Sequence, residues 1–172
     1  MKDKSDFEKN LSQVIGESFT FSFKKDKKNI GSSWCRLDNA CDIKDVALFM
    51  QKIDGRLITI TASDIGNDVK EIIYHFDLLG DCCNIVVRID DNKIESITPI
   101  LKTADWTERE LKELYAIEVI GHPNPKRLFL EETIEEGVMN NYIPLSEAMN
   151  GASSQTIWEK IMSSTNKENT DG

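Results

Sequence analysis

Alternation of apolar and polar side chains in residues 56–62 and 69–79 constrains the fold of this chain more than any other feature. A period of two is that of a strand with one buried face, so both segments are expected to be strands. Gly80-Asp81 separates the second segment from residues 83–90, which predicts an antiparallel hairpin. The chain is therefore expected to fold around a sheet.

The alternation also predicts which side chains share a face. In residues 69–79, one face is expected to carry Ile72, Tyr74, Phe76 and Leu78. The opposite face is expected to carry Ile73, His75 and Asp77. In residues 56–62, the same rule places Ile58, Ile60 and Ala62 on one face, with Leu57, Thr59 and Thr61 on the other.

Segments with helical periodicity lie on both sides of these strands. Residues 6–15 carry an apolar stripe, and residues 43–53 carry a second one that begins after Asp42. A third helix is expected at about 104–116. The order predicts an α+β fold with helices packed on one face of a mixed or mostly antiparallel sheet. We expect one domain over residues 1–132, carrying segment 104–130, and a partner-docking or disordered, irregular C-terminal extension over 133–172.

Charge and hydropathy exclude several classes of partner. The 172 residues include 21 basic and 30 acidic ones, a net charge of −9. An acidic chain is a poor ligand for nucleic acid, because phosphate binding needs clustered cations. No apolar run approaches the roughly 20 residues of a membrane-spanning helix, and the first residues lack the apolar core of a signal peptide. The sequence therefore predicts a cytoplasmic protein that meets a membrane only through a partner.

The residues that could carry redox or metal chemistry are few. Neither the histidines, His75 and His122, nor the cysteines show the spacing of a metal site; the cysteines are Cys35, Cys41, Cys82 and Cys83. Adjacent cysteines on a strand point to opposite faces, so packing thiols are the favoured interpretation. Motifs that cradle nucleotide phosphates are absent from the sequence. A stand-alone metal-dependent enzyme and a soluble regulatory adaptor remain as competing hypotheses.

Segment 104–130 concentrates charge on a short helix and then turns through Gly121-His122-Pro123. On the helix, Arg109 with Glu113 and Glu108 with Lys112 have the spacing of ion pairs. These charges form either a solvated helix surface or an interface at which Arg109 and a carboxylate are buried against a partner. The histidine is expected to be a hydrogen-bonded structural residue in an ordered loop.

Several fixed positions of this segment resemble a known family: Asp105-Trp106, Glu108-Arg109-Glu110, Glu113-Leu114-Tyr115, His122, and Lys126 before Leu128. The pattern is similar to that of the thirty-kilodalton subunit family of respiratory complex I, the NADH:quinone oxidoreductase. That family includes the homologous small subunit of energy-converting membrane-bound [NiFe] hydrogenases and formate hydrogenlyases. The resemblance implies a non-catalytic accessory subunit of the peripheral arm that docks to and orients the large catalytic subunit.

The same resemblance implies where the cofactors and partners lie. No cofactor is expected in this chain; a [NiFe] centre and iron–sulfur clusters are expected in partner subunits. The partners would be a [NiFe]-hydrogenase-like or complex I large subunit, a small iron–sulfur subunit and, indirectly, the membrane module on its cytoplasmic face. The hydrogenase-type assembly is the preferred interpretation, and complex I is the alternative.

Nine positions are expected to bind the partner: Trp106, Glu108, Arg109, Glu110, Glu113, Tyr115, His122, Lys126 and Arg127. For the tryptophans, Trp34, Trp106 and Trp158, core packing is nevertheless the favoured interpretation. Ala116 departs from the family, which usually has glycine there. Because alanine resists positive φ, the turn after Tyr115 is expected to differ.

Overall fold

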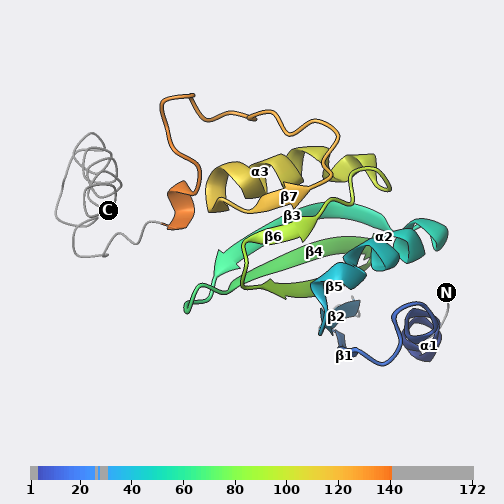
Figure 1. The fold of residues 1–172 in the computed structure, drawn as a ribbon. Helices are drawn as coiled ribbons and strands as arrows, with labels where there is room; N and C mark the ends of the chain where they lie inside the picture. Colours follow the sequence, from blue (N-terminus) through green and yellow to red (C-terminus); the bar gives the residue numbers. More distant parts are fainter. Residues whose placement is uncertain (1–3, 26, 28–30, 141–172) are drawn as a thin grey trace.

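A five-stranded mixed sheet forms the centre of the molecule in the computed structural model, which describes residues 4–25, 27 and 31–140 (Figure 1). The strand order is β1-β2-β5-β4-β3, and β2 and β5 alone among these neighbours run parallel. The strands are β1 (Phe19–Lys25), β2 (Gly31–Leu37), β3 (Arg56–Asp64), β4 (Lys70–Leu78) and β5 (Asp81–Ile89). A small parallel pair joins β6 (Lys93–Glu95) to β7 (Glu118–Ile120).

The α-helices of the described residues are α1 (Lys4–Ile15), α2 (Ile43–Lys52) and α3 (Asp105–Tyr115). Short 3-10 helices precede α2 (Ala40–Asp42) and α3 (Lys102–Ala104) and form residues Val138–Asn140. One core joins Leu11 of α1, Met50 of α2 and Leu111 of α3 to Tyr74 of β4 and Ile85 of β5. All three helices therefore lie on one face of the sheet (Figure 1), and the predicted α+β fold is confirmed.

The predicted faces are confirmed in β4 and wrong in β3. In β4, Ile72, Tyr74 and Phe76 are fully buried on the helix-covered face. In β3, the register shifts between Leu57 and Thr59, so two neighbouring positions no longer alternate as in a regular strand. Leu57 and Ile60 are buried as a result, whereas Ile58 is 53% exposed. Sequence alternation continues through the bulge and cannot reveal it.

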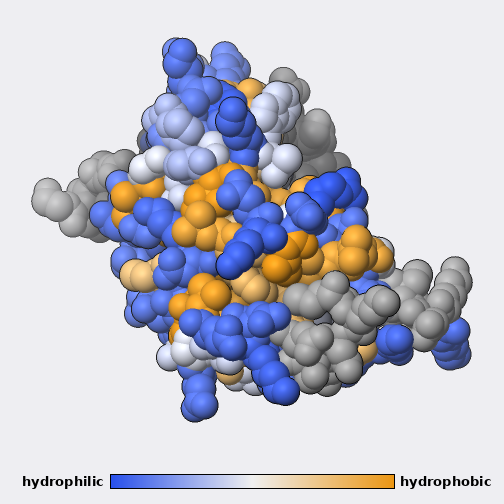
Figure 2. Space-filling model, turned by 90° about the vertical axis from the view of Figure 1, so that its right-hand side faces the viewer, coloured by the Kyte–Doolittle hydropathy of each residue, from blue (hydrophilic) through white to orange (hydrophobic). Residues whose placement is uncertain are grey.

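The surface over α1 and α2 is partly apolar. Figure 2 faces this end of the molecule and shows apolar side chains gathered among charged ones. Val14 and Leu48 line a groove between the two helices and are each nearly half exposed. The expected core packing of the tryptophans is wrong for Trp34 and Trp106, which are 43% and 68% exposed, and Trp158 lies outside the described residues.

Helix α3 ends with Ala116 in the left-handed region, at φ 53° and ψ 37°. The expectation that alanine would keep this turn out of positive φ is therefore wrong. Tertiary hydrogen bonds hold the turn: Lys70 Nζ and Asn140 Nδ2 both donate to the Tyr115 carbonyl, the second over 3.0 Å. The surrounding structure thus imposes a conformation that alanine disfavours.

Ala116→Gly is expected to stabilise the isolated chain by about 1 kcal/mol, because glycine adopts positive φ without steric cost. Ala116→Val is the matched control and is expected to destabilise, since a β-branched side chain is worse than alanine there. Urea unfolding of the three proteins measures both differences. A glycine variant no more stable than the natural chain would contradict the argument.

Candidate functional site

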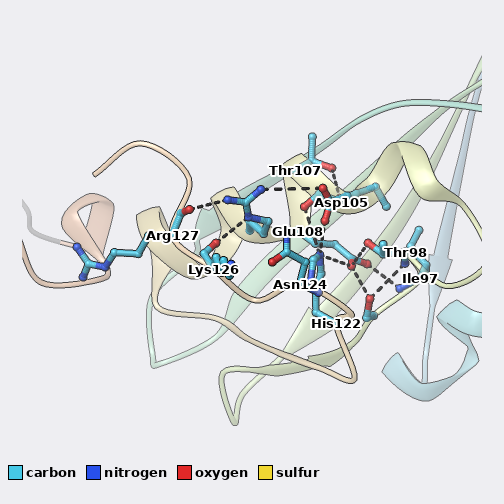
Figure 3. A network of polar contacts seen from close by, with 12 residues as sticks. Ile97, Thr98, Asp105, Thr107, Glu108, His122, Asn124, Lys126 and Arg127 are labelled. Atoms are coloured by element: carbon cyan, nitrogen blue, oxygen red, sulfur yellow. Dashed lines mark hydrogen bonds and ion pairs between the residues drawn. The ribbon is translucent and has the colours of Figure 1, made fainter. Parts of the chain in front are cut away.

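Residues 121–131, called the strap, follow β7 and run along α3 (Figure 3). Charged α3 side chains hold the strap by binding its backbone or its histidine. Three of them, Asp105, Arg109 and Glu113, recur every fourth residue and therefore lie on one side of the helix. The strap is fixed from below by α3, although it has no regular secondary structure of its own.

Glu113 binds the far end of the strap. The residue is 1% exposed, and its carboxylate accepts hydrogen bonds from the backbone N–H groups of Leu128, Phe129 (3.2 Å) and Leu130 (3.5 Å). The backbone carbonyl of Glu113 accepts a further bond from Gly137, over 2.8 Å. The Glu113 carboxylate thereby satisfies consecutive backbone N–H groups of a loop that pairs with no β-strand.

Arg109 binds the middle of the strap through backbone carbonyls. Its Nε donates to the Lys126 carbonyl over 2.7 Å, and Nη2 donates to the Arg127 carbonyl over 2.5 Å. Nη1 lies 4.0 Å from the Asp105 carboxylate. The ion pair predicted between Arg109 and Glu113 is wrong, because both side chains bind the strap backbone instead.

Glu108 faces the other way, into the loop that precedes α3. Its buried carboxylate accepts hydrogen bonds of 2.6 Å from Ser96 Oγ, the Ile97 backbone N–H and Thr98 Oγ. The predicted pair with Lys112 is also wrong, since Lys112 lies 3.7 Å from Glu136. The loop before α3, rather than a partner protein, therefore buries this carboxylate in the described structure.

His122 joins the strap to the first turn of α3. Its side chain is 2% exposed, with Nε2 3.4 Å from an Asp105 carboxylate oxygen and 3.7 Å from Glu108. Nδ1 accepts a hydrogen bond of 3.0 Å from the Asn124 N–H, so the ring proton lies on Nε2. The histidine is therefore the structural loop residue that its Gly-His-Pro context predicts.

The predicted partner-binding residues all lie on α3 and the strap, but they divide into three groups by exposure. Glu108, Glu113 and His122 are buried within the chain; Glu113 binds the strap backbone, and Glu108 binds the loop before α3. Trp106 and Lys126 are exposed, while the remaining positions are half-buried: Arg109, Glu110, Tyr115 and Arg127. Phe129, which sequence reasoning did not select, is 58% exposed on the strap.

Sequence reasoning also missed the internal partners of these charges. Ser96 and Thr98, two residues apart before α3, supply hydroxyl donors to Glu108. Lys70, on β4, reaches the C-terminal carbonyl of α3, and burial lowers the pKa of its amine. Two hydroxyl residues spaced by one position before a helix could have indicated hydrogen bonds to a carboxylate of that helix. Nothing in the sequence near Lys70 indicates its contact with α3.

The cysteines and histidines do not converge on one centre. All cysteines are free thiols, and burial raises the pKa of Cys35 to about 12 and of Cys83 to about 11. His75 lies on the sheet face opposite the helices, whereas His122 is under the strap. Within the described ranges, His, Cys, Asp and Glu side chains form no group of three or more that could hold a metal ion.

Crossing a membrane would need a longer and more apolar helix than any found in residues 4–25, 27 and 31–140.

A family model described as the 30 kDa subunit of respiratory-chain NADH dehydrogenase matches residues 39–155, which include α3 and the whole strap. An NADH-quinone oxidoreductase subunit of Chloroherpeton thalassium is 29% identical over 126 residues, which cover 67% of this chain and 52% of that protein. A second such subunit, of Phocaeicola vulgatus, is 33% identical over 81 residues, 44% of this chain and 16% of that protein. The chain thus spans about half or less of these relatives' length.

Solved structures show the same fold at low sequence identity. A chain of an archaeal membrane-bound sulfane sulfur reductase superposes with a TM-score of 0.67 at 16% identity, covering 87% of this chain and 95% of that one. The trypsin-resistant fragment of Nqo5 superposes with a TM-score of 0.53 at 18% identity, covering 69% of this chain and 98% of the fragment.

Proposed function

The chain belongs to the 30 kDa subunit family of respiratory-chain NADH dehydrogenase, and we propose that it is a non-catalytic accessory subunit that docks to the large subunit of a membrane-associated redox complex. Docking would use the outer surface of the strap and the exposed side of α3. The proposed role is to hold the peripheral arm together and to orient the large subunit over the membrane module, on its cytoplasmic face.

The observation that carries this proposal is the use of buried charge to fix a loop. Glu113 and Arg109 bind the strap backbone, and Glu113 is almost completely removed from water. Burying charge contributes little net stability, so its benefit here is a single defined conformation. A loop held in this way costs little entropy when a partner binds its outer side.

The exposed side of α3 and the strap carries residue types that contribute most to protein interfaces. Trp106 is 68% exposed and Phe129 is 58% exposed, an unusual exposure for aromatic side chains of their size. Lys126 adds an exposed cation between them in sequence. Exposed aromatic anchors and an exposed cation on α3 and the strap suit a partner surface with an apolar pocket and a carboxylate.

The preferred assembly is of the energy-converting [NiFe] hydrogenase type, in which the partners would be the large [NiFe] subunit and a small iron–sulfur subunit. The thirty-kilodalton subunit of an NADH:quinone oxidoreductase, complex I, is the second candidate, favoured by the names of the curated relatives. The membrane-bound sulfane sulfur reductase favours a hydrogenase-like assembly in equal measure. Nickel content of the purified assembly separates them, because the [NiFe] centre alone requires that metal.

A double variant, Trp106→Ser with Lys126→Glu, tests docking. Both side chains are exposed, so the melting temperature of the isolated chain is expected to change by less than about 3 °C. The amount of chain recovered with the large subunit from detergent-solubilised membranes is expected to fall about tenfold. Leu79→Ser is the matched control, since Leu79 is 89% exposed on the β4–β5 turn, outside α3 and the strap. Equal recovery of variant and control would overturn the proposal, as would substrate turnover by the isolated chain.

A further inference from the structure

The sheet face that points away from α1, α2 and α3 is called the open face. It carries an exposed tryptophan, a hydrogen-bonded histidine and two arginines. Strand register places Trp34 of β2 beside Asn84 of β5 and, beyond it, His75 of β4. Arg36 and Arg88 lie on the same face, because each is an even number of residues from Trp34 or Asn84. The described helices cover the other face.

Charge on the open face is unbalanced. Arg36 Nη2 lies 3.7 Å from Glu71 Oε2, and Arg88 Nε lies 2.9 Å from the same oxygen. One carboxylate therefore serves two guanidinium groups, whose side chains remain 50% and 46% exposed. This leaves a positive charge unmatched on one face of a chain whose net charge is −9. A carboxylate from outside is its chemical complement.

The middle of the open face holds one exposed indole on a hydrogen-bonded polar network. Trp34 is 43% exposed. Next to it, His75 Nδ1 lies 2.7 Å from Asn84 Oδ1, and Asn84 Nδ2 donates to the Ser33 carbonyl over 3.1 Å. These bonds fix the side chains around the indole before any partner arrives, which reduces the entropy cost of binding. An exposed tryptophan on a rigid support, with arginines on the same face, is typical of an interface centre.

We infer that the open face binds an acidic protein surface, with a partner carboxylate against the exposed guanidinium groups of Arg36 and Arg88 and with Trp34 as the apolar anchor. The inference rests on the proposed function in one respect: the partner is a subunit of the same assembly. It concerns a different face from the strap. A protein fits better than a phosphate polymer or an anionic membrane, because those partners bind clustered cations, whereas Glu71 and Asp77 interrupt the arginines of this face.

Hydroxyl-radical footprinting of the intact assembly tests the inference directly. Oxidation of Trp34 is expected to be about tenfold slower in the assembly than in the isolated chain, because the indole becomes buried at an interface centre. In parallel, a double variant, Trp34→Ser with Arg36→Gln, is expected to reduce recovery with the large subunit about tenfold. Arg88 keeps its pair with Glu71 in this variant, so the isolated chain should still fold, as its melting curve will show.

Each outcome decides one question. Equal oxidation of Trp34 in both samples overturns the inference. If the strap variant loses assembly and the open-face variant does not, the inference fails and the proposed function stands; if neither variant loses assembly, both fail. Binding of the isolated chain to anionic vesicles or to a single-stranded oligonucleotide, abolished by Arg36→Gln, would overturn the assignment to a protein. Self-association abolished by Trp34→Ser would overturn it in favour of a second copy.

Discussion

Glu108→Ala is expected to lower the free energy of unfolding by about 3–5 kcal/mol. The substitution removes the acceptor of three hydrogen bonds of 2.6 Å, from Ser96, Ile97 and Thr98, at a position 1% exposed. The donors stay buried without the carboxylate, and a cavity replaces it. Urea unfolding followed by circular dichroism measures the loss.

Two further variants separate this explanation from a general effect of lost charge. Glu118→Ala removes a carboxylate that is 62% exposed and pairs with Lys93 on the surface, so a loss of no more than about 1 kcal/mol is expected. Glu108→Gln keeps one carbonyl acceptor and nearly the same volume, so its loss should fall between the two. A Glu108→Ala variant as stable as Glu118→Ala would show that the carboxylate is hydrated in solution.

The spacing of apolar residues predicted most of the fold, because it shows which side chains are buried. A sheet with helices on one face buries one side of each strand and one side of each helix. The alternation in β4 and the stripes of α1 and α2 follow from that rule. Two local features escaped it for physical reasons. The bulge in β3 changes the register without changing the sequence pattern, and the positive φ of Ala116 is imposed by contacts from residues distant in sequence.

The charges of α3 were located correctly and paired incorrectly. Spacing along a helix predicts partners on the same helix, and this rule holds for an isolated helix in water. In the folded chain, Glu113 and Arg109 have backbone donors and acceptors of the strap within reach. A backbone group that lacks a ladder partner competes for a charged side chain more effectively than another solvated ion. Sequence spacing contains no information on where the strap returns.

Glu113→Ala is expected to loosen the strap while most of the domain stays folded. The variant therefore shows whether assembly depends on an ordered strap. Its carboxylate accepts N–H groups of the strap, which lies at the surface, so water can replace part of the lost bonds. We expect a loss of about 2 kcal/mol in unfolding free energy. Amide exchange at Leu128, Phe129 and Leu130 should accelerate about 30-fold or more, as measured by exchange mass spectrometry. Glu110→Ala, on the same helix, is the matched control.

Recovery of Glu113→Ala with the large subunit then tests whether the fixed conformation of the strap matters for docking. Trp106 and Phe129 are unchanged in sequence in this variant, so the same anchor side chains are available to the partner. If the conformation matters, the partner must spend binding energy to order the strap, and recovery should fall several-fold while most of the domain stays folded. Faster exchange with unchanged recovery would mean that the anchors dock from a mobile strap, and the buried carboxylate would then serve folding alone.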